Sequence, residues 1–272
     1  MENNHFKKLK GRPENAGIPP ILYKYRDWED EYHKRILTHN EIYFAPPSHF
    51  EDELDCRVPI RYDLLSDNEI YDIYYKSSKK SHPNYTRNQR RQYAREWCKK
   101  GLLRNKEHLK STDDEFFKKF NNNVGVLSLT AKSNNIDMWN NYSNCGKGFC
   151  IGFNTTLMLN ELPNAFGSGM EVSYYDELPI IKFTYSIERG YFLQVYSKLK
   201  KYEYEKEYRL TKLGINSRQL SVPSEMFSHI IIGENMPGES KNEIITLATK
   251  FKNVTLYTAT FDNDKVEIVP LQ

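Results

Sequence analysis

The sequence predicts an α+β fold with a mixed, mainly antiparallel split sheet, flanking helices and one helical insertion. Short apolar and aromatic runs, bounded by Gly, Pro and polar residues, recur along the chain and predict strands. Amphipathic stretches between these runs predict helices. Residues 62–120 differ from the rest because they are helical in pattern and strongly basic, which predicts an inserted segment.

The composition is that of a folded globular protein. Apolar residues make up 39% of the 272 residues and aromatic residues 14%, which is enough for a sizeable core. Residues 1–18 read as a polar, flexible lead without a secretory signal, and residues 19–272 as a single domain. No run of about 18 apolar residues is present, so no membrane span is expected. Four scattered cysteines without a C-x-x-C pair predict reduced thiols in a cytoplasmic protein and no metal site.

The individual elements follow from local patterns. The run ILYKYR predicts a strand at 21–26, and acids early with bases late predict a helix at 28–39. The other expected elements are strands at 41–45, 124–131, 148–154 and 204–211, a helix at 191–202, and a strand–helix–strand unit from 227 to 261.

The basic segment is the strongest charge asymmetry of the chain. From Lys76 to Lys106 there are 11 basic residues against the single acid Glu96, so this stretch is +10 in a chain of net charge +3. An apolar stripe that includes Tyr93 and Trp97 predicts one buried helix face and one exposed basic face.

Such a face suits a polyanion, because Lys and Arg clusters supply most non-specific affinity for nucleic acid. The candidate nucleic-acid-binding residues are Arg87, Arg90, Arg91 and Arg95. Interleaved aromatic residues, among them Tyr85, would stack on single-stranded bases. The alternative is a solvated face that offsets the acidic remainder of the chain.

The stretch YEKEYRLT, residues 204–211, is the main candidate for chemistry. As a strand it would place Glu205, Glu207 and Arg209 on one face, with the two carboxylates about 6.6 Å apart. That face is either a charge-balanced edge exposed to water or the working face of a site.

Two other stretches could line a ligand pocket. Ser128 and Thr130 share one face of a strand, where small hydroxyls permit the close approach of a flat ligand. Trp139 and Tyr142 lie at i and i+3 of a short helix and could stack on a ring. Core packing is the alternative interpretation of both aromatic residues.

The acidic loop at 51–55 offers a different chemistry. Its residues Asp52 and Asp55, together with Glu205 and Glu207, could bind metal ions in a metal-dependent nuclease if all four converged. The alternative is a solvated loop whose carboxylates accept hydrogen bonds from nearby backbone amides.

Four blocks occur in an order that resembles a known family. They are LYKYR, EIYFAPPSHFEDELD, VLSLTAKSNNIDMWNNYSNCGKGFCIGF and YEKEYRLT, and together they run from about residue 20 to 270. In this order they resemble the bacterial domain-of-unknown-function family 2971. The name of that family states no activity, so the function must be inferred from the residues of the site.

The order of chemical roles also resembles the plan of ADP-ribosyltransferases. That plan implies NAD as substrate and no metal. It implies catalytic roles for Glu207 and Glu205, the former beside the ribose and the latter beside the acceptor. The residues implied to bind NAD are Arg26, Lys24, Ser128, Thr130, Trp139 and Tyr142.

Three functional hypotheses follow. The first is an NAD-using transferase or NAD glycohydrolase, a toxin-like effector of bacterial conflict or phage defence, with a nucleic-acid or protein acceptor. The second is a non-catalytic sensor that binds a nucleotide or a protein. The third is the metal-dependent nuclease.

Overall fold

The computed structural model describes residues 17–161 and 168–271, and it confirms the predicted α+β class. The described residues form two compact units. The first contains residues 17–50, 123–161, 168–176 and 198–271, and the second contains residues 51–122 and 177–197. The predicted basic insertion at 62–120 lies within the second unit.

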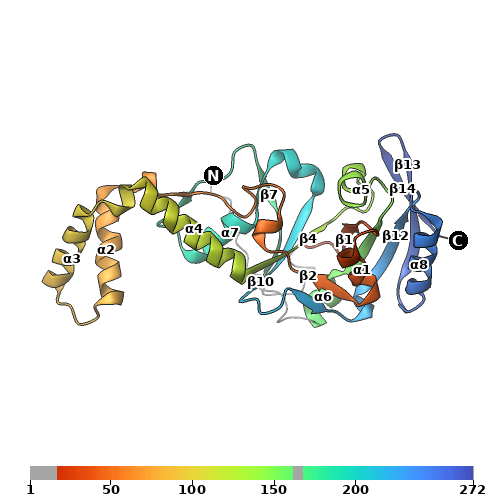
Figure 1. Ribbon diagram of the computed structural model, residues 1–272, viewed down its shortest axis with the longest axis horizontal. Helices are drawn as coiled ribbons and strands as arrows, with labels where there is room; N and C mark the ends of the chain where they lie inside the picture. The colour runs from red at the N-terminus through yellow and green to blue at the C-terminus, as the bar shows by residue number, and fades with distance from the viewer. Residues whose placement is uncertain (1–16, 162–167, 272) are drawn as a thin grey trace. The chain divides into compact units, whose positions relative to one another are not determined.

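An eight-stranded sheet forms the centre of the first unit (Figure 1). Its order is β14-β13-β12-β5-β1-β4-β10-β6. All neighbouring strands are antiparallel except β12 and β13, which are parallel. The strands are β1 (Ile21–Arg26), β4 (Val124–Thr130), β5 (Phe149–Asn154), β6 (Ser168–Glu171), β10 (Glu207–Leu213), β12 (Phe227–Gly233), β13 (Thr255–Asp262) and β14 (Lys265–Pro270).

Helices cover both faces of this sheet, as its alternating apolar residues require. On one face, α1 (Glu31–Thr38), α6 (Thr155–Glu161) and α8 (Gly238–Ala248) pack over a large core that includes Leu129 and Leu210. On the other face, α5 (Ile136–Tyr142) contributes Trp139 to a smaller core with Tyr25. Short elements complete the unit: β2 (Glu41–Tyr43), η2 (Pro47–His49), β7 (Ser173–Tyr175), β9 (Ser197–Leu199), η5 (Lys200–Glu205), β11 (Gln219–Ser221) and η6 (Ser224–Met226).

The pairing of β1 with β4 is the weakest in the main sheet, and we call this place the split of the sheet. Strand β1 pairs with β5 through six residues, but with β4 only through Tyr23 and Thr130. Beyond this pair the two strands have no paired residues. Polar groups can therefore enter the sheet at this point.

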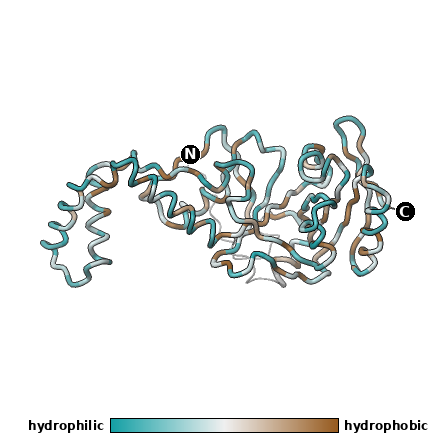
Figure 2. The backbone as a smooth tube through the Cα atoms, in the orientation of Figure 1, coloured by the Kyte–Doolittle hydropathy of each residue, from teal (hydrophilic) through white to brown (hydrophobic). Residues whose placement is uncertain are grey.

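The second unit is mainly helical. Its elements are β3 (Ile60–Arg61), η3 (Tyr62–Leu64), α2 (Asp67–Ser81), α3 (Arg87–Lys99), η4 (Leu102–Arg104), α4 (Lys106–Asn123), β8 (Ile181–Lys182) and α7 (Ile187–Val195). Helices α2 and α3 form a hairpin, and each begins with a capping box, at Ser66 and Thr86 respectively. Figure 2 shows that hydrophilic residues dominate this hairpin.

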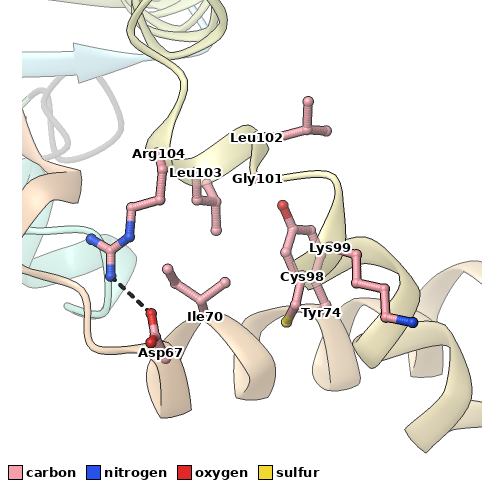
Figure 3. A pocket seen from close by; sticks show the side chains of 9 residues that line it. All are labelled: Asp67, Ile70, Tyr74, Cys98, Lys99, Gly101, Leu102, Leu103 and Arg104. Atoms are coloured by element: carbon pink, nitrogen blue, oxygen red, sulfur yellow. Dashed lines mark hydrogen bonds and ion pairs between the residues drawn. The ribbon is translucent and has the colours of Figure 1, made fainter.

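The predicted apolar stripe of α3 packs against α2. Ala94 is fully buried, and the Trp97 ring lies 5.7 Å from Tyr74 and 5.5 Å from Tyr93 between ring centroids. Where the hairpin meets η4 there is a pocket of about 390 Å³, lined in part by Tyr74 and Cys98 (Figure 3). The Asp67 carboxylate at its rim accepts a 3.2 Å hydrogen bond from Arg104.

The region before the main candidate stretch differs from the prediction. The expected helix at 191–202 is wrong, because α7 spans 187–195 and is followed by β9 and η5. Its true N-cap is Ser186, whose hydroxyl accepts a hydrogen bond from the Arg189 amide. Among the described residues, no helix is both long and apolar enough to cross a membrane.

Candidate acid pair beside the split of the sheet

Glu205 and Glu207 do not lie on one strand, so the predicted strand over 204–211 is wrong at its first residues. Glu205 ends the 3-10 helix η5, and Glu207 begins β10. Lys206 between them has a left-handed backbone with φ of 44°. Lys206 is thus the junction between η5 and β10, and the carboxylates on either side of it come from two different elements.

Glu207 forms a two-point ion pair with Arg209, its neighbour along the same face of β10. The Arg209 Nε and Nη2 atoms donate to the two carboxylate oxygens at 2.8 and 2.9 Å. Arg209 has no solvent exposure and Glu207 is 4% exposed. The Arg209 guanidinium also lies over the Phe50 ring, 5.1 Å from its centroid. The face of β10 that carries Glu207 and Arg209 is therefore buried. This excludes the alternative of a charge-balanced strand edge exposed to water.

Lys198 joins the two glutamates. Its ammonium donates to Glu205 Oε2 and, at 3.2 Å, to Glu207 Oε2. Lys198 is itself 8% exposed, and Glu205 is 4% exposed. One cation thus lies between two buried carboxylates.

The two carboxyl groups have pKa values shifted in opposite directions. Burial raises the pKa of Glu207, but the Arg209 and Lys198 charges outweigh burial and lower it to about 2. Burial raises the pKa of Glu205, with the negative charge of Glu207 adding to the rise and Lys198 opposing it. Neighbouring groups with pKa values pushed apart are typical of acid–base pairs in enzymes.

Three hydrogen bonds fix Glu205 and the segment before it. The Tyr142 hydroxyl donates to Glu205 Oε1 at 2.9 Å, and Thr130 Oγ1 donates to the Glu205 backbone carbonyl at 2.6 Å. Asn135, the N-cap of α5, donates its side-chain amide to the Tyr204 carbonyl at 2.5 Å. The predicted residues Thr130 and Tyr142 therefore belong to this site as supports of Glu205.

The Lys24 side chain lies at the split of the sheet, between β1 and β4. Its ammonium donates to the Ser128 carbonyl at 2.7 Å, beyond the point where β1 and β4 stop pairing. Burial lowers the pKa of Lys24 well below its usual value, with the Arg26 charge adding to the fall and Glu207 opposing it. The predicted cation of the first strand is thus within electrostatic reach of the acid pair.

Ser128 faces the same site. It lies opposite Arg209 in the register of β4 and β10, so the two side chains share one face of the sheet. Its hydroxyl oxygen is buried and helps to lower the pKa of Glu207, although no partner meets the geometry of a full hydrogen bond.

Arg26 and Trp139 have different surroundings. Burial lowers the pKa of Arg26 to about 10, with Asp30 opposing that shift, and Arg26 acts on the site through its repulsion of Lys24. Trp139 is fully buried, with its ring edge-on to Tyr25 at 5.2 Å and its Nε1 donating to the Ser133 carbonyl at 2.9 Å. Trp139 is therefore a core residue and not an open stacking surface.

The acidic loop lies in the other unit. There the Asp52 carboxylate accepts a 3.1 Å hydrogen bond from the Leu54 amide, as expected of a loop whose acids bind nearby backbone amides. Asp55 of the same loop is buried. Across residues 17–161 and 168–271, no three His, Cys, Asp or Glu side chains come together to hold a metal ion. The described residues thus provide no ligand set for the nuclease hypothesis.

Comparison with known proteins identifies one segment of the chain. Residues 138–210 match the family described as Protein of unknown function (DUF2971). The match confirms the resemblance over this segment, which runs from α5 to the first half of β10. No curated protein and no solved structure matches the chain.

The DUF2971 segment contains both glutamates and two contributors that sequence reasoning missed, Lys198 and Tyr174. The Tyr174 hydroxyl accepts a 2.9 Å hydrogen bond from the Glu207 amide. Lys198 was missed because the sequence pattern placed residues 191–202 in one helix. In such a helix Lys198 is not distinguished from the other lysines of that stretch. The available signal was the two apolar residues Val195 and Tyr196 before it, which are buried in the structure.

Lys198 in the DUF2971 segment yields a pH-dependent prediction. Lys198→Met is expected to lower the free energy of unfolding by about 2 kcal/mol at pH 8, because it leaves two carboxylates side by side. Without the ammonium, the raised pKa of Glu205 rises further, so the folded state binds more protons than the unfolded state above pH ~4.5. Stability is therefore lost as pH rises through that window, and the deficit is smaller at pH 5 than at pH 8.

Urea denaturation at the two pH values measures this difference. Lys200→Met is the matched control, since the Lys200 side chain is 58% exposed and pairs with Asp176 at 3.4 Å. An equal deficit for both variants at both pH values would contradict the role of Lys198.

Proposed function

We propose that the chain cleaves the nicotinamide–ribose bond of NAD, as an NAD glycohydrolase or an ADP-ribosyltransferase. The observation that carries this proposal is the acid pair: two buried carboxylates with opposite pKa shifts that share the Lys198 ammonium. Keeping charges in a protein interior is costly, so such an arrangement is typical of functional sites.

The chemistry of this bond needs a carboxylate that is ionised at every working pH. As the C1′–N bond breaks, its electron pair neutralises the pyridinium nitrogen and the ribose becomes an oxocarbenium ion. A fixed negative charge beside the sugar stabilises that cation. Glu207 suits this role because its pKa is lowered to about 2 and Arg209 holds it in place.

Glu205 suits the second half of the reaction. Water, or the hydroxyl of an acceptor, adds to C1′ and loses one proton. A carboxylate of raised pKa is the better base for that proton, and the pKa of Glu205 is raised. Tyr142 and Thr130 orient Glu205 through its side chain and its backbone. The products are nicotinamide and either ADP-ribose or an ADP-ribosylated acceptor.

The remaining predicted residues suit binding of the nucleotide. The Arg26 guanidinium, with a pKa lowered only to about 10, could oppose the pyrophosphate. A phosphate near Lys24 would favour its charged form against the effect of burial, and the Ser128 hydroxyl could meet a ribose hydroxyl. An enzyme that consumes NAD in this way would act as a toxin-like effector in bacterial conflict or phage defence.

A nucleotide sensor is the second candidate. It is favoured by the complete two-point pairing of Glu207 with Arg209, an arrangement that holds a face rigid without chemistry. It predicts that NAD binds and is recovered intact.

The test is incubation of the purified protein with NAD and, separately, with NADH. We expect nicotinamide release from NAD and none from NADH, because the reduced ring carries no positive charge and is a poor leaving group. Chromatography of the products distinguishes nicotinamide from AMP. Binding of NAD without turnover would support the sensor, and AMP from both nucleotides would overturn cleavage at the ribose.

A further inference from the structure

The exposed side of α3 carries a continuous row of cations. Arg87, Arg91, Arg95 and Lys99 follow one another at four-residue intervals, and all four are exposed. Each interval rises about 6 Å along the helix and turns by about 40°, so the row winds through about 120° of the α3 surface over about 18 Å.

The row has no acidic partner on the described part of the chain. Neither an ion pair nor a carboxylate hydrogen bond joins any of the four cations to a described residue. Glu96, the one acid of the helix, accepts a hydrogen bond from Gln92 at 2.9 Å.

Arg90 does not belong to the row. It is half-buried, and its Nη2 atom donates to the Pro83 carbonyl at 2.8 Å, which ties α3 to the turn before it. Its role is therefore to fix the hairpin, unlike the other three predicted arginines.

The row weakens the isolated helix. Like charges at i and i+4 cost about 0.2–0.5 kcal/mol per pair, and the row contains three such pairs in succession. No ion pair with a described residue offsets this repulsion, so an external polyanion is the natural source of charge compensation.

The neighbours of the row indicate which polyanion. A helix that lies on a lipid surface needs apolar side chains beside its cations. Here the exposed residues between the cations are Asn88, Gln89, Gln92 and Glu96, all polar. A membrane surface is therefore disfavoured.

The packing of the aromatic residues in the hairpin disfavours stacking on single-stranded bases. Tyr85 stacks on His82 with centroids 4.3 Å apart, and the rings of Tyr93 and Trp97 pack on each other and toward α2. Single-strand binding uses open aromatic faces, and these faces are occupied. The row offers charge alone, which suits the regular phosphates of a duplex.

We propose that Arg87, Arg91, Arg95 and Lys99 of α3 bind the phosphate backbone of a nucleic-acid duplex without reading its sequence. This inference does not rest on the proposed activity toward NAD. It predicts a salt dependence set by four phosphate contacts, with a slope of log K against log salt of about −3.6.

The test is fluorescence anisotropy with the full chain and a labelled 20-base-pair DNA duplex between 50 and 200 mM salt. The triple variant Arg87→Gln, Arg91→Gln, Arg95→Gln is expected to reduce the slope by about 2.7 and to weaken binding at least about tenfold. The matched control is Lys106→Gln, Lys110→Gln, Lys118→Gln on α4, which removes the same charge from exposed positions. Circular dichroism should show both variants folded, because the first relieves repulsion within α3.

An equal loss of affinity in the two triple variants would overturn the proposal, since net charge alone would then explain binding. Binding to vesicles of phosphatidylserine and phosphatidylcholine in preference to the duplex would also overturn it. A loss confined to the α3 variant supports it.

Discussion

Arg209→Met is expected to lower the free energy of unfolding by about 3–5 kcal/mol, because it leaves the Glu207 carboxylate buried without its main partner. Both hydrogen bonds of the pair are lost, and the methionine side chain cannot replace them because it has no hydrogen-bond donor. Chemical denaturation at pH 7 measures the change. A double-mutant cycle of Arg209→Met, Glu207→Gln and the variant with both changes measures the interaction between the two side chains. Its coupling energy should be about 2 kcal/mol or more.

Arg61→Met is the matched control for this prediction. Arg61 pairs with Asp63 at the same two-residue spacing and with the same two-point geometry, at 2.7 and 2.6 Å, but both side chains are exposed. Its loss is expected to cost at most about 1 kcal/mol. Similar costs for Arg61→Met and Arg209→Met would show that burial does not strengthen the pair.

Much of the main sheet could be predicted from local patterns. The strands at 21–26, 124–130 and 149–154 are apolar runs with clear ends, and the structure contains them within about one residue of the prediction. Strands β4 and β5 are buried on both faces, which follows from their nearly continuous apolar character.

The acid pair itself could be predicted only in part. The sequence pattern identified Glu205, Glu207, Tyr142 and Thr130, but it placed both glutamates on one strand. The structure separates them by a left-handed residue, Lys206. Glycine is the usual marker of that conformation, and a lysine gives no such signal.

Lys198 shows a different limit of sequence reasoning. In the stretch YSKLKKY one lysine is buried between two carboxylates, whereas Lys200 and Lys201 are exposed. Residue type and local spacing do not tell which of these lysines is buried. Burial depends on the pairing of β9 with β7, which lies about 20 residues earlier in the chain. The exposure of Arg87, Arg91 and Arg95 follows more directly from the sequence, because the period of a single helix determines which residues face away from its apolar stripe.

Glu207→Gln tests the proposed catalytic role. The amide keeps the shape of the side chain but removes the charge that would stabilise the oxocarbenium ion. We expect nicotinamide release from NAD to fall by about 10³-fold, the scale of losing one fixed electrostatic group in an active site. The folded fraction must be measured alongside, because Arg209 and Lys198 lose a buried partner in this variant.

Two further variants keep the test sharp if Glu207→Gln is unstable. Glu203→Gln is the control, because Glu203 lies in the same 3-10 helix and, among the described residues, its carboxylate pairs with Lys206, at 3.2 Å, and with no other cation. Tyr142→Phe removes the hydroxyl from Glu205 and leaves the Glu207–Arg209 pair intact. It should reduce turnover about tenfold, the scale of one hydrogen bond, without a large loss of stability.

The most direct measurement is therefore the rate of nicotinamide release from NAD, per folded molecule, by the wild-type protein, Glu203→Gln and Glu207→Gln side by side. The acid pair predicts equal rates for the first two and a rate about 10³-fold lower for the third. Equal rates in all three, or no nicotinamide from the wild-type protein, would contradict the assignment of Glu207 to this chemistry.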